Sequence, residues 1–281
     1  NVIHDLDKNS IKIDRIRDEI FKGFMFNIKR NKKLKIIHIS NFGNRQANRL
    51  YNISIAKKIT NGLIRNGNDV INISDRDVVR LNRGLKSFKK GSDFLNNLLL
   101  ETIDNYRPDL MILGHVNNLQ EKTLEIAKKK YQNLKITQWF EDNLSKNGPD
   151  PITNKNNFLK YINYIDHSFV TSDPDNLKLD KKYKCNYLPI PVDENIEYLN
   201  CYENKNPIKD VFFTMSHGVN KGVLRKNKID VREPFVKKLI SLNPNIIFDI
   251  YGYKNQQPIW SQDFYDTLYK SKMALNLSRI N

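Results

Sequence analysis

A loop rich in glycine and basic residues follows a predicted strand at Val211–Met215. Gly218 and Gly222 leave backbone N–H groups accessible to a ligand. Lys221 and Arg225 add positive charge to the same loop. Because backbone amides and cationic side chains together bind diphosphates, this loop is a candidate diphosphate site. A plain basic surface loop is the alternative interpretation.

Candidate acid–base groups follow two other predicted strands. Glu141 and Asp142 come directly after a strand at Lys135–Phe140, and His115 comes shortly after one at Leu110–Leu113. A carboxylate or an imidazole at such a place can take a proton from a reacting hydroxyl group. A helix cap for Asp142 and a structural, hydrogen-bonded imidazole for His115 are the alternatives. The sequence does not rank the three residues as the base.

A third candidate loop, Ser40–Arg49, follows the first predicted strand at Leu34–Ile39 and contains Gly43. The glycine permits close approach of a ligand to the backbone, and the predicted helix that follows favours an anion at its N-terminus. One glycine is not the G-x-G-x-x-G fingerprint of dinucleotide sites, so a tight polar turn is an equal alternative.

Several other chemistries lack the residues that they need. The five histidines and the two cysteines, Cys185 and Cys201, show no metal-ligand spacing, and there is no Gly-x-Ser-x-Gly elbow. We therefore expect no metal and no bound cofactor, with free thiols in a reducing compartment. Nucleic acid is not an expected partner, because no recognition motif accompanies the positive charge.

Alternating strand and helix patterns at a spacing of about 30 residues predict a mostly parallel sheet with right-handed crossovers. In such sheets ligands bind beyond the carboxyl ends of the strands, which is where the three candidate loops lie. Further strands are predicted at Val70–Ile73, Ser168–Thr171, Ile246–Tyr251 and Met273–Leu277, and helices at Ala47–Ile64, from Ser92 as cap, at Leu119–Tyr131, Phe158–Ile165, Pro234–Leu242 and Phe264–Ser271.

The chain of 281 residues is long enough for about two domains. Pro189 and Pro191 hold an extended linker at Tyr187–Asp193, after which the strand–helix pattern starts again. We predict an α/β protein of two Rossmann-like domains, at residues 1–190 and 191–281. The N-terminal domain carries an added amphipathic helix at residues 5–30, and the C-terminal domain is expected to be incomplete.

The net charge of +16 favours anionic partners. Residues 1–190 hold 34 basic and 21 acidic side chains, whereas residues 191–281 hold 13 and 10. No apolar run approaches the roughly 18 residues of a transmembrane helix, and no signal peptide is visible. We expect a cytoplasmic protein, with contact to an anionic membrane at its inner face as an option. A basic stretch, interpreted as a loop, could contact lipid phosphates. It contains Arg76, Arg80, Arg83, Lys86, Lys89 and Lys90.

The order of motifs resembles the GT-B glycosyltransferases, and more narrowly bacterial members whose C-terminal part is similar to a spore-protein glycosyltransferase-like domain. The resemblance covers about residues 34–279. It is carried by HISNFGNRQANRLYNISIAKKITNGLIRNGNDVINISDRD, QWFEDN, YLPIPVD, FFTMSHGVNKGVLR, FDIYG and SKMALNLSR. It implies two Rossmann-like domains with the active site between them.

The resemblance also implies roles for individual residues. The second domain would bind a nucleotide-diphosphate sugar, the first would bind the acceptor, and Gly43 would face the donor. Family members continue past the LNLSR strand, so this chain would lack part of the donor site. The donor diphosphate would face Gly218, Lys221, Gly222 and Arg225, and the base or sugar would lie near Tyr251, Gly252, Asn276, Ser278 and Arg279.

The expected function is therefore transfer of a sugar from a nucleotide-diphosphate donor to a glycan, lipid-linked or protein acceptor, in surface-polysaccharide assembly. The diphosphate that leaves needs positive groups, and Lys, Arg and backbone amides supply them without a metal. A degenerate, non-catalytic transferase that binds a glycan or an anion is the alternative. A sugar-nucleotide epimerase, which needs no acceptor, is a further one.

Overall fold

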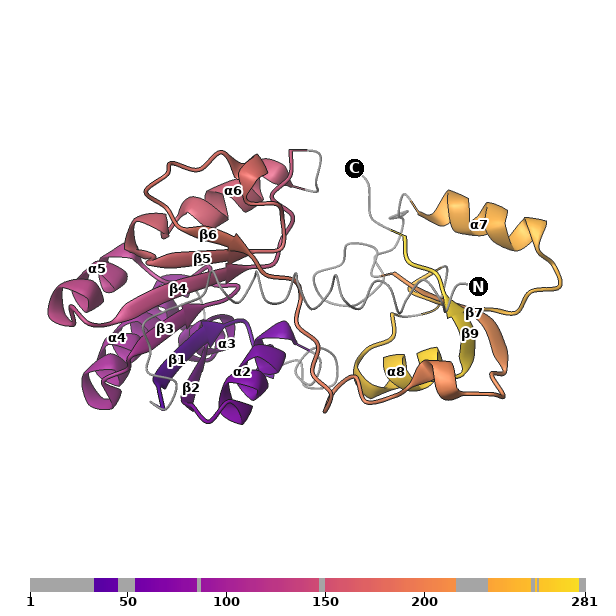
Figure 1. Cartoon of the computed structure of the whole chain (residues 1–281), viewed down its shortest axis with the longest axis horizontal. Coiled ribbons are helices and arrows are strands. Elements are labelled where there is room, and N and C mark those ends of the chain that lie inside the picture. Colours follow the sequence, from indigo (N-terminus) through magenta and orange to yellow (C-terminus); the bar gives the residue numbers. More distant parts are fainter. Residues whose placement is uncertain are drawn as a thin grey trace, which may run out of the picture. The chain divides into compact units, whose positions relative to one another are not determined.

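A computed structural model describes residues 33–44, 54–84, 87–146, 150–215, 232–253, 256 and 258–277, and the statements below concern these residues. The chain is an α/β protein with two parallel sheets, as the sequence predicts (Figure 1). Both sheets belong to one contact unit, Lys35–Asn281. The domain boundary at residue 190 therefore stays a prediction.

The first sheet contains six strands in the order β2-β1-β3-β4-β5-β6, and every neighbouring pair is parallel. Its central strands are apolar because helices cover both faces, so Ile37 of β1 and Met111 of β3 are completely buried. The strands are β1 (Lys35–Ser40), β2 (Asp69–Ser74), β3 (Leu110–Leu113), β4 (Lys135–Phe140), β5 (His167–Val170) and β6 (Cys185–Tyr187).

Five described helices accompany this sheet, and three short 3₁₀ turns follow the last of them. The helices are α2 (Ile55–Arg65), α3 (Asp75–Asn82), α4 (Phe88–Tyr106), α5 (Glu121–Lys130) and α6 (Pro151–Leu159), and the 3₁₀ turns are η3 (Ile162–Tyr164), η4 (Asp175–Leu177) and, after the sheet, η5 (Cys201–Glu203). Among the described residues, no helix has both the length and the apolar character that crossing a bilayer requires.

The strand order creates a switch point beside β1. The chain moves from β1 to β2 on one side and then crosses to β3 on the other side of β1. The loops after β1 and β3 therefore run in opposite directions from adjacent strand ends, and a crevice opens between them. A ligand of this sheet is therefore expected there.

The second sheet contains three parallel strands in the order β8-β7-β9: β7 (Lys209–Thr214), β8 (Phe248–Tyr251) and β9 (Ser271–Ala274). Helices α7 (Glu233–Leu242) and α8 (Ser261–Tyr269) lie on opposite sides of it (Figure 1). A small core packs around Phe213, Met215, Val236 and Ile250.

Five local predictions are wrong. Most of the basic stretch is helical and not a loop, because Arg76 and Arg80 belong to α3, which ends at Asn82, and Lys89 and Lys90 belong to α4, which begins at Phe88. Ser92 therefore lies inside a helix and caps nothing. Helix α2 begins at Ile55, after the N-cap Ser54, and not at Ala47. The helix predicted at Phe158–Ile165 is α6, which starts at Pro151 because proline suits the first helical turn. The linker prediction missed strand β6, and its first residue, Tyr187, is the last residue of that strand.

The segment that follows β6 is fastened to helix α2 by a buried carboxylate. Asp193 accepts hydrogen bonds from Asn61 Nδ2 at 2.7 Å, from Arg65 Nη1 at 3.1 Å and from the Asn195 amide at 3.0 Å. Burial alone would raise the pKa of Asp193, but these three donors outweigh burial and lower that pKa below its usual value. The ionised form is thus the one that the fold stabilises.

We expect Asp193→Asn to lower the free energy of unfolding by about 2 kcal/mol at pH 7, because charged hydrogen bonds of this kind are lost. A lowered pKa in the folded state gives stability that is present above the usual pKa and disappears as the pH falls below it. The deficit of the variant should therefore shrink between pH 4 and about pH 2. Urea unfolding across this range measures it, and the exposed Asp175→Asn is the matched control. A stability deficit that does not change with pH would contradict the conclusion that the ionised Asp193 carboxylate stabilises the fold.

Candidate functional site

His115 is placed by backbone contacts at the switch point of the first sheet. The Gly114 amide donates to the Ile39 carbonyl at 2.8 Å, and the His115 amide donates to Ser40 Oγ at 3.2 Å. A Cβ on Gly114 would overlap the side chain of Ser40. Only glycine therefore lets the loop after β3 lie against the end of β1, and this contact fixes the backbone that carries His115.

The three predicted acid–base residues lie together. His115 Nδ1 is 3.1 Å from Glu141 Oε1 and 3.9 Å from Asp142 Oδ2. The loop with both carboxylates is held by Thr171, whose hydroxyl donates to the Glu141 carbonyl at 2.9 Å. Glu141 Oε1 can accept a hydrogen bond from Nδ1, and in that tautomer of the imidazole Nε2 carries the lone pair. His115 Nε2 is thus the atom that can accept a proton.

The two carboxylates have different environments. Burial raises the pKa of Asp142 above its usual value, His115 opposes that rise, and the neighbouring Glu141 carboxylate adds to it. Like His115, the guanidinium of Arg76 in helix α3 lowers the pKa of Asp142 and so offsets part of the rise. Asp142 therefore keeps a proton more readily than an ordinary aspartate, whereas Glu141 is the closer partner of the imidazole.

A cavity of about 220 Å³ opens beside the pair. It brings together Gly43, His115 and Glu141, which follow β1, β3 and β4. The first residues of helix α2, with its N-cap Ser54, form another part of the wall, so the positive end of the helix dipole faces the cavity. The remaining lining comes from Ser40, Asn41, Ile55, Ala56, Ile59 and Trp139. The cavity can therefore hold a polar, partly anionic group next to an acid–base pair.

The sequence analysis missed the two buried carboxylates that hold the rim of this cavity. Asp77 Oδ2 accepts from the Asn44 amide at 2.8 Å and thereby ties the loop after β1. Asp75 Oδ2 accepts from the Asn117 amide and from Asn118 Nδ2, both at 3.0 Å, and ties the loop after β3. Two aspartates directly after the predicted strand at Val70–Ile73 were the available signal.

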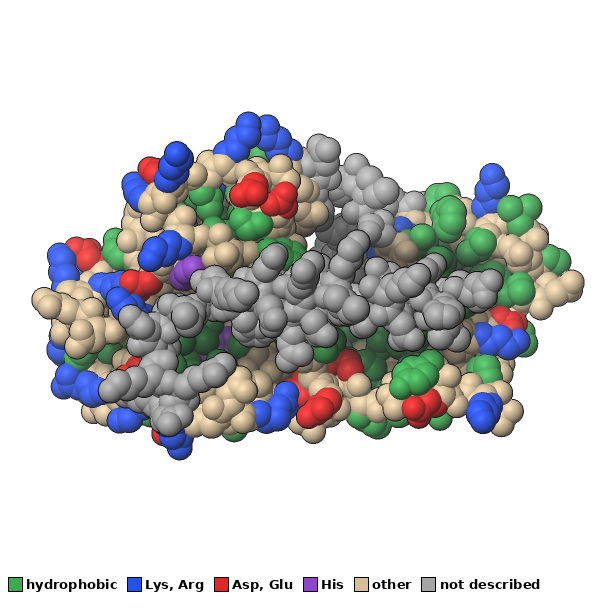
Figure 2. All heavy atoms as spheres, viewed as in Figure 1, with side chains coloured by type: hydrophobic (Ala, Val, Ile, Leu, Met, Phe, Trp, Pro, Cys, Tyr) green, Lys and Arg blue, Asp and Glu red, His purple; other side chains and the backbone are tan. Residues whose placement is uncertain are grey.

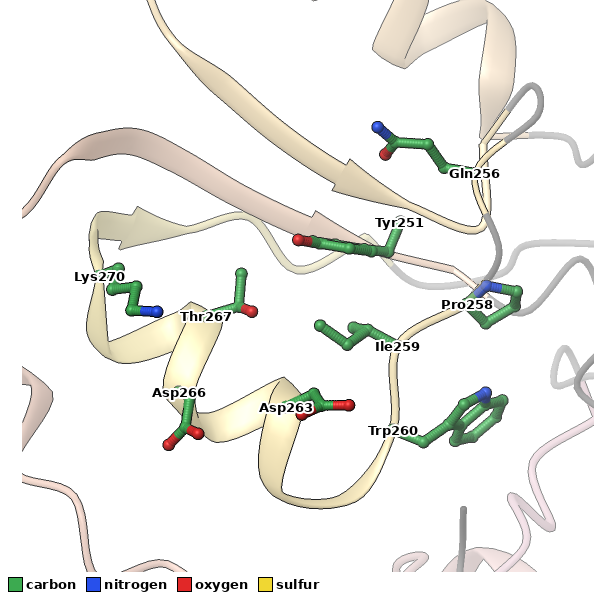
Figure 3. A pocket seen from close by; sticks show the side chains of 9 residues that line it. All are labelled: Tyr251, Gln256, Pro258, Ile259, Trp260, Asp263, Asp266, Thr267 and Lys270. Carbon is green, nitrogen blue, oxygen red and sulfur yellow. The ribbon is translucent and has the colours of Figure 1, made fainter. Parts of the chain in front are cut away.

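A second cavity, of about 660 Å³, adjoins the end of β8 and contains the predicted Tyr251 (Figure 3). The Tyr251 ring and Ile259 face the side chains that helix α8 presents (Figure 3). Burial raises the pKa of Tyr251, so its hydroxyl stays protonated and can donate a hydrogen bond. The other walls are Gln256, Pro258, Trp260, Asp263, Asp266, Thr267 and Lys270. Two carboxylates suit ligand hydroxyl groups better than a diphosphate.

Gly252 has a structural reason to be glycine. Its φ angle is +72°, and a Cβ there would overlap the carbonyl oxygen of Met215. The turn after β8 therefore needs a residue without a side chain, whatever else it contacts. Asn276 is exposed after the end of β9. The other donor-site predictions, Gly218, Lys221, Gly222, Arg225, Ser278 and Arg279, lie outside the described residues.

Metal and thiol chemistry find no support in the part of the chain that the structure describes. No group of three or more His, Cys, Asp or Glu side chains there could hold a metal ion. Burial raises the pKa of the Cys185 thiol to about 11, so the thiolate is scarce at neutral pH. Metal-free chemistry remains a prediction.

No protein-family model matches the chain, and no curated protein matches it. Among solved structures, one similar protein is described as a UDP-N-acetylglucosamine 2-epimerase from Listeria monocytogenes. It shares 12% identity over 86% of this chain and 74% of its own, with a TM-score of 0.43. Another is an α-glucosyltransferase in complex with UDP and a 13-mer DNA with a central A:G mismatch. It shares 16% identity over 89% of this chain and 73% of its own, with a TM-score of 0.43.

Proposed function

We propose that this chain is a glycosyltransferase that moves a sugar from a nucleotide-diphosphate donor to an acceptor hydroxyl group. The observation that supports it most is the pairing of His115 Nδ1 with Glu141 at 3.1 Å, beside a cavity at the switch point of a parallel sheet. A hydroxyl acceptor needs a base at this place, and an imidazole oriented by a carboxylate is such a base.

In the proposed reaction, protein side chains handle the proton and the developing charge, and no metal ion is needed. His115 Nε2 takes the proton of the acceptor hydroxyl while the acceptor oxygen forms a bond to the anomeric carbon of the donor. The bond from that carbon to the diphosphate oxygen breaks, and the nucleoside diphosphate leaves with the electron pair. Glu141, and Asp142 when it is ionised, stabilise the imidazolium that forms.

The donor would be bound by the second half of the chain. Gly218, Lys221, Gly222 and Arg225 are our candidates for the diphosphate, because their types and spacing fit an anion. The cavity around Tyr251 supplies aromatic rings and carboxylates that fit the base, ribose or sugar. The acceptor, a place in surface-polysaccharide assembly and a cytoplasmic location remain part of this proposal.

A nucleotide sugar should raise the melting temperature, because a ligand that binds only the folded state stabilises it by about 2.7 kcal/mol at 100 times its Kd. We expect a rise of several degrees with UDP-glucose, UDP-N-acetylglucosamine or GDP-mannose. Thermal unfolding in the presence of each donor measures the shift. The double variant Lys221→Ala with Arg225→Ala should abolish it.

The matched control removes the same charge from the same half of the chain at Lys237 and Lys238, which are exposed on helix α7. Lys237→Ala with Lys238→Ala should leave the shift intact. Absence of a shift with every nucleotide sugar would contradict the proposal. A shift without transfer to any acceptor would instead indicate the non-catalytic binding protein.

A further inference from the structure

A groove lies beside helix α6, where the loops after β4 and β5 meet, and it has a volume of about 430 Å³. Its walls include Leu144, Phe158, Leu159, Leu177 and Leu179. Leu144 and Phe158 belong to an apolar cluster, against which the other three pack while still partly exposed. We call this site the α6 groove. Its volume lies within the range of pockets that take small ligands.

The rim of the α6 groove is basic. Lys146, Lys155 and Lys178 line it, and no acidic side chain is among its described lining residues. None of the three lysines forms an ion pair with another described residue. Figure 2 shows Lys and Arg side chains at the upper edge of the α6 region, with acidic side chains close below them in the same region. An apolar floor with a cationic rim fits a ligand that has an apolar chain and an anionic head.

The carboxylates of the loop after β5 have partners of their own. Asp173 accepts a hydrogen bond from Asn176 Nδ2 at 2.7 Å and another from the Asp175 amide at 3.0 Å. Asp180 forms an ion pair with Lys182 at 3.7 Å. Among the described residues, no ion pair joins Asp173 or Asp180 to a lysine of the α6 groove.

The α6 groove continues the loop that carries the acid–base pair. Leu144 and Lys146 follow Asp142 within four residues. The Leu144 amide donates to Ser172 Oγ at 2.9 Å, and the Thr171 hydroxyl donates to the Glu141 carbonyl at 2.9 Å. The same two loops therefore build the groove and hold the carboxylates at the carboxyl ends of β4 and β5.

We propose that the α6 groove binds a lipid phosphate, with its alkyl chain on the leucines and its phosphate on the lysines. This choice of acceptor class rests on the proposed transferase function. The acceptor is then a lipid-linked saccharide, rather than a free glycan or a protein: the groove binds its lipid phosphate, and its sugar presents the acceptor hydroxyl. The exposed Ile152 side chain stands at the groove and would cover part of the chain.

The test is calorimetric titration of the full chain with monomeric octyl, decyl and dodecyl phosphate, without any donor. Affinity should rise about four-fold for each methylene that the groove buries. Lys155→Glu with Lys178→Glu should lower the affinity for dodecyl phosphate at least ten-fold, and Ile152→Ser should lower it several-fold. All three positions are exposed, so folding should survive, and circular dichroism checks this. Lys181→Glu, an exposed lysine outside the lining, is the matched control and should change little.

Four outcomes would overturn the α6 groove as a lipid-phosphate site. They are equal binding of inorganic phosphate and dodecyl phosphate, affinity that does not depend on chain length, equal loss in Lys181→Glu, and binding to phosphatidylglycerol vesicles alone. If the full chain binds no alkyl phosphate but still transfers sugar to a soluble glycan, the lipid-phosphate site is refuted and the transferase function is not. Intact alkyl phosphate binding without transfer from any donor would refute the transferase only.

Discussion

Replacing His115 with alanine should lower the rate of sugar transfer roughly 10²- to 10⁴-fold, the usual contribution of a positioned general base. Glu141 Oε1, 3.1 Å from Nδ1, orients the imidazole. No hydrogen bond of Nε2 is among the described contacts, so this atom can face the acceptor. Donor binding should stay intact, because the diphosphate candidates lie in another loop. Steady-state kinetics at saturating donor, together with the donor-induced melting shift, separate the two effects.

The matched control is His167→Ala. His167 is the first residue of β5, so it lies at the amino ends of the strands, away from the carboxyl ends that carry the candidate site. His167 contacts Asn186 Oδ1 at 2.7 Å, and its ring stacks on Phe169 of the same strand. This variant should keep most of the transfer rate. The transfer rate of Glu141→Gln should lie between the rates of His115→Ala and His167→Ala. The glutamine side chain can still accept a hydrogen bond, but it no longer carries the charge that stabilises an imidazolium. A fully active His115→Ala beside an inactive Asp142→Asn would move the base to the carboxylate.

The strands of this fold other than β6 could be predicted because they are short apolar runs between polar turns. The bounds predicted for β3 and β4 are those observed, at Leu110–Leu113 and Lys135–Phe140. Adjacent parallel strands bring their carboxyl ends together, so the meeting of His115 with Glu141 follows from the sheet order. What periodicity could not supply was that order, and with it the switch point beside β1.

The missed elements are those in which charge hides the helical pattern. Helix α3 buries only one apolar side chain, Val79, beside Asp75 and Asp77, so its sequence resembles a solvated loop. Both aspartates accept backbone hydrogen bonds from distant loops, an arrangement that tertiary contact creates and local propensity does not show. The helix start at Ile55 was likewise hidden, because Ala47 and Leu50 precede it at helical spacing.

Gly252→Ala should destabilise the second sheet by about 3 kcal/mol or more. Alanine would occupy the left-handed region at a cost of roughly 1 to 2 kcal/mol, and its Cβ would overlap the Met215 carbonyl oxygen, which adds an overpacking cost of about the same size. The backbone cannot move away cheaply, because the Met215 amide donates to the Tyr251 carbonyl at 3.0 Å. Hydrogen exchange should show lost protection in β7, β8 and β9 before the first sheet is affected.

Two other glycines separate the contributions to this loss. Gly67 has φ at +82° and no atom within 4 Å of a built Cβ, so Gly67→Ala should cost only the backbone strain of about 1 to 2 kcal/mol. Gly62 lies inside helix α2 with similar free space and no positive φ, so Gly62→Ala should stabilise the protein by roughly 0.5 to 1 kcal/mol. If Gly252→Ala proved no worse than Gly67→Ala, the close approach of the β8 turn to Met215 would be refuted, and with it the packing that holds Tyr251 at its cavity.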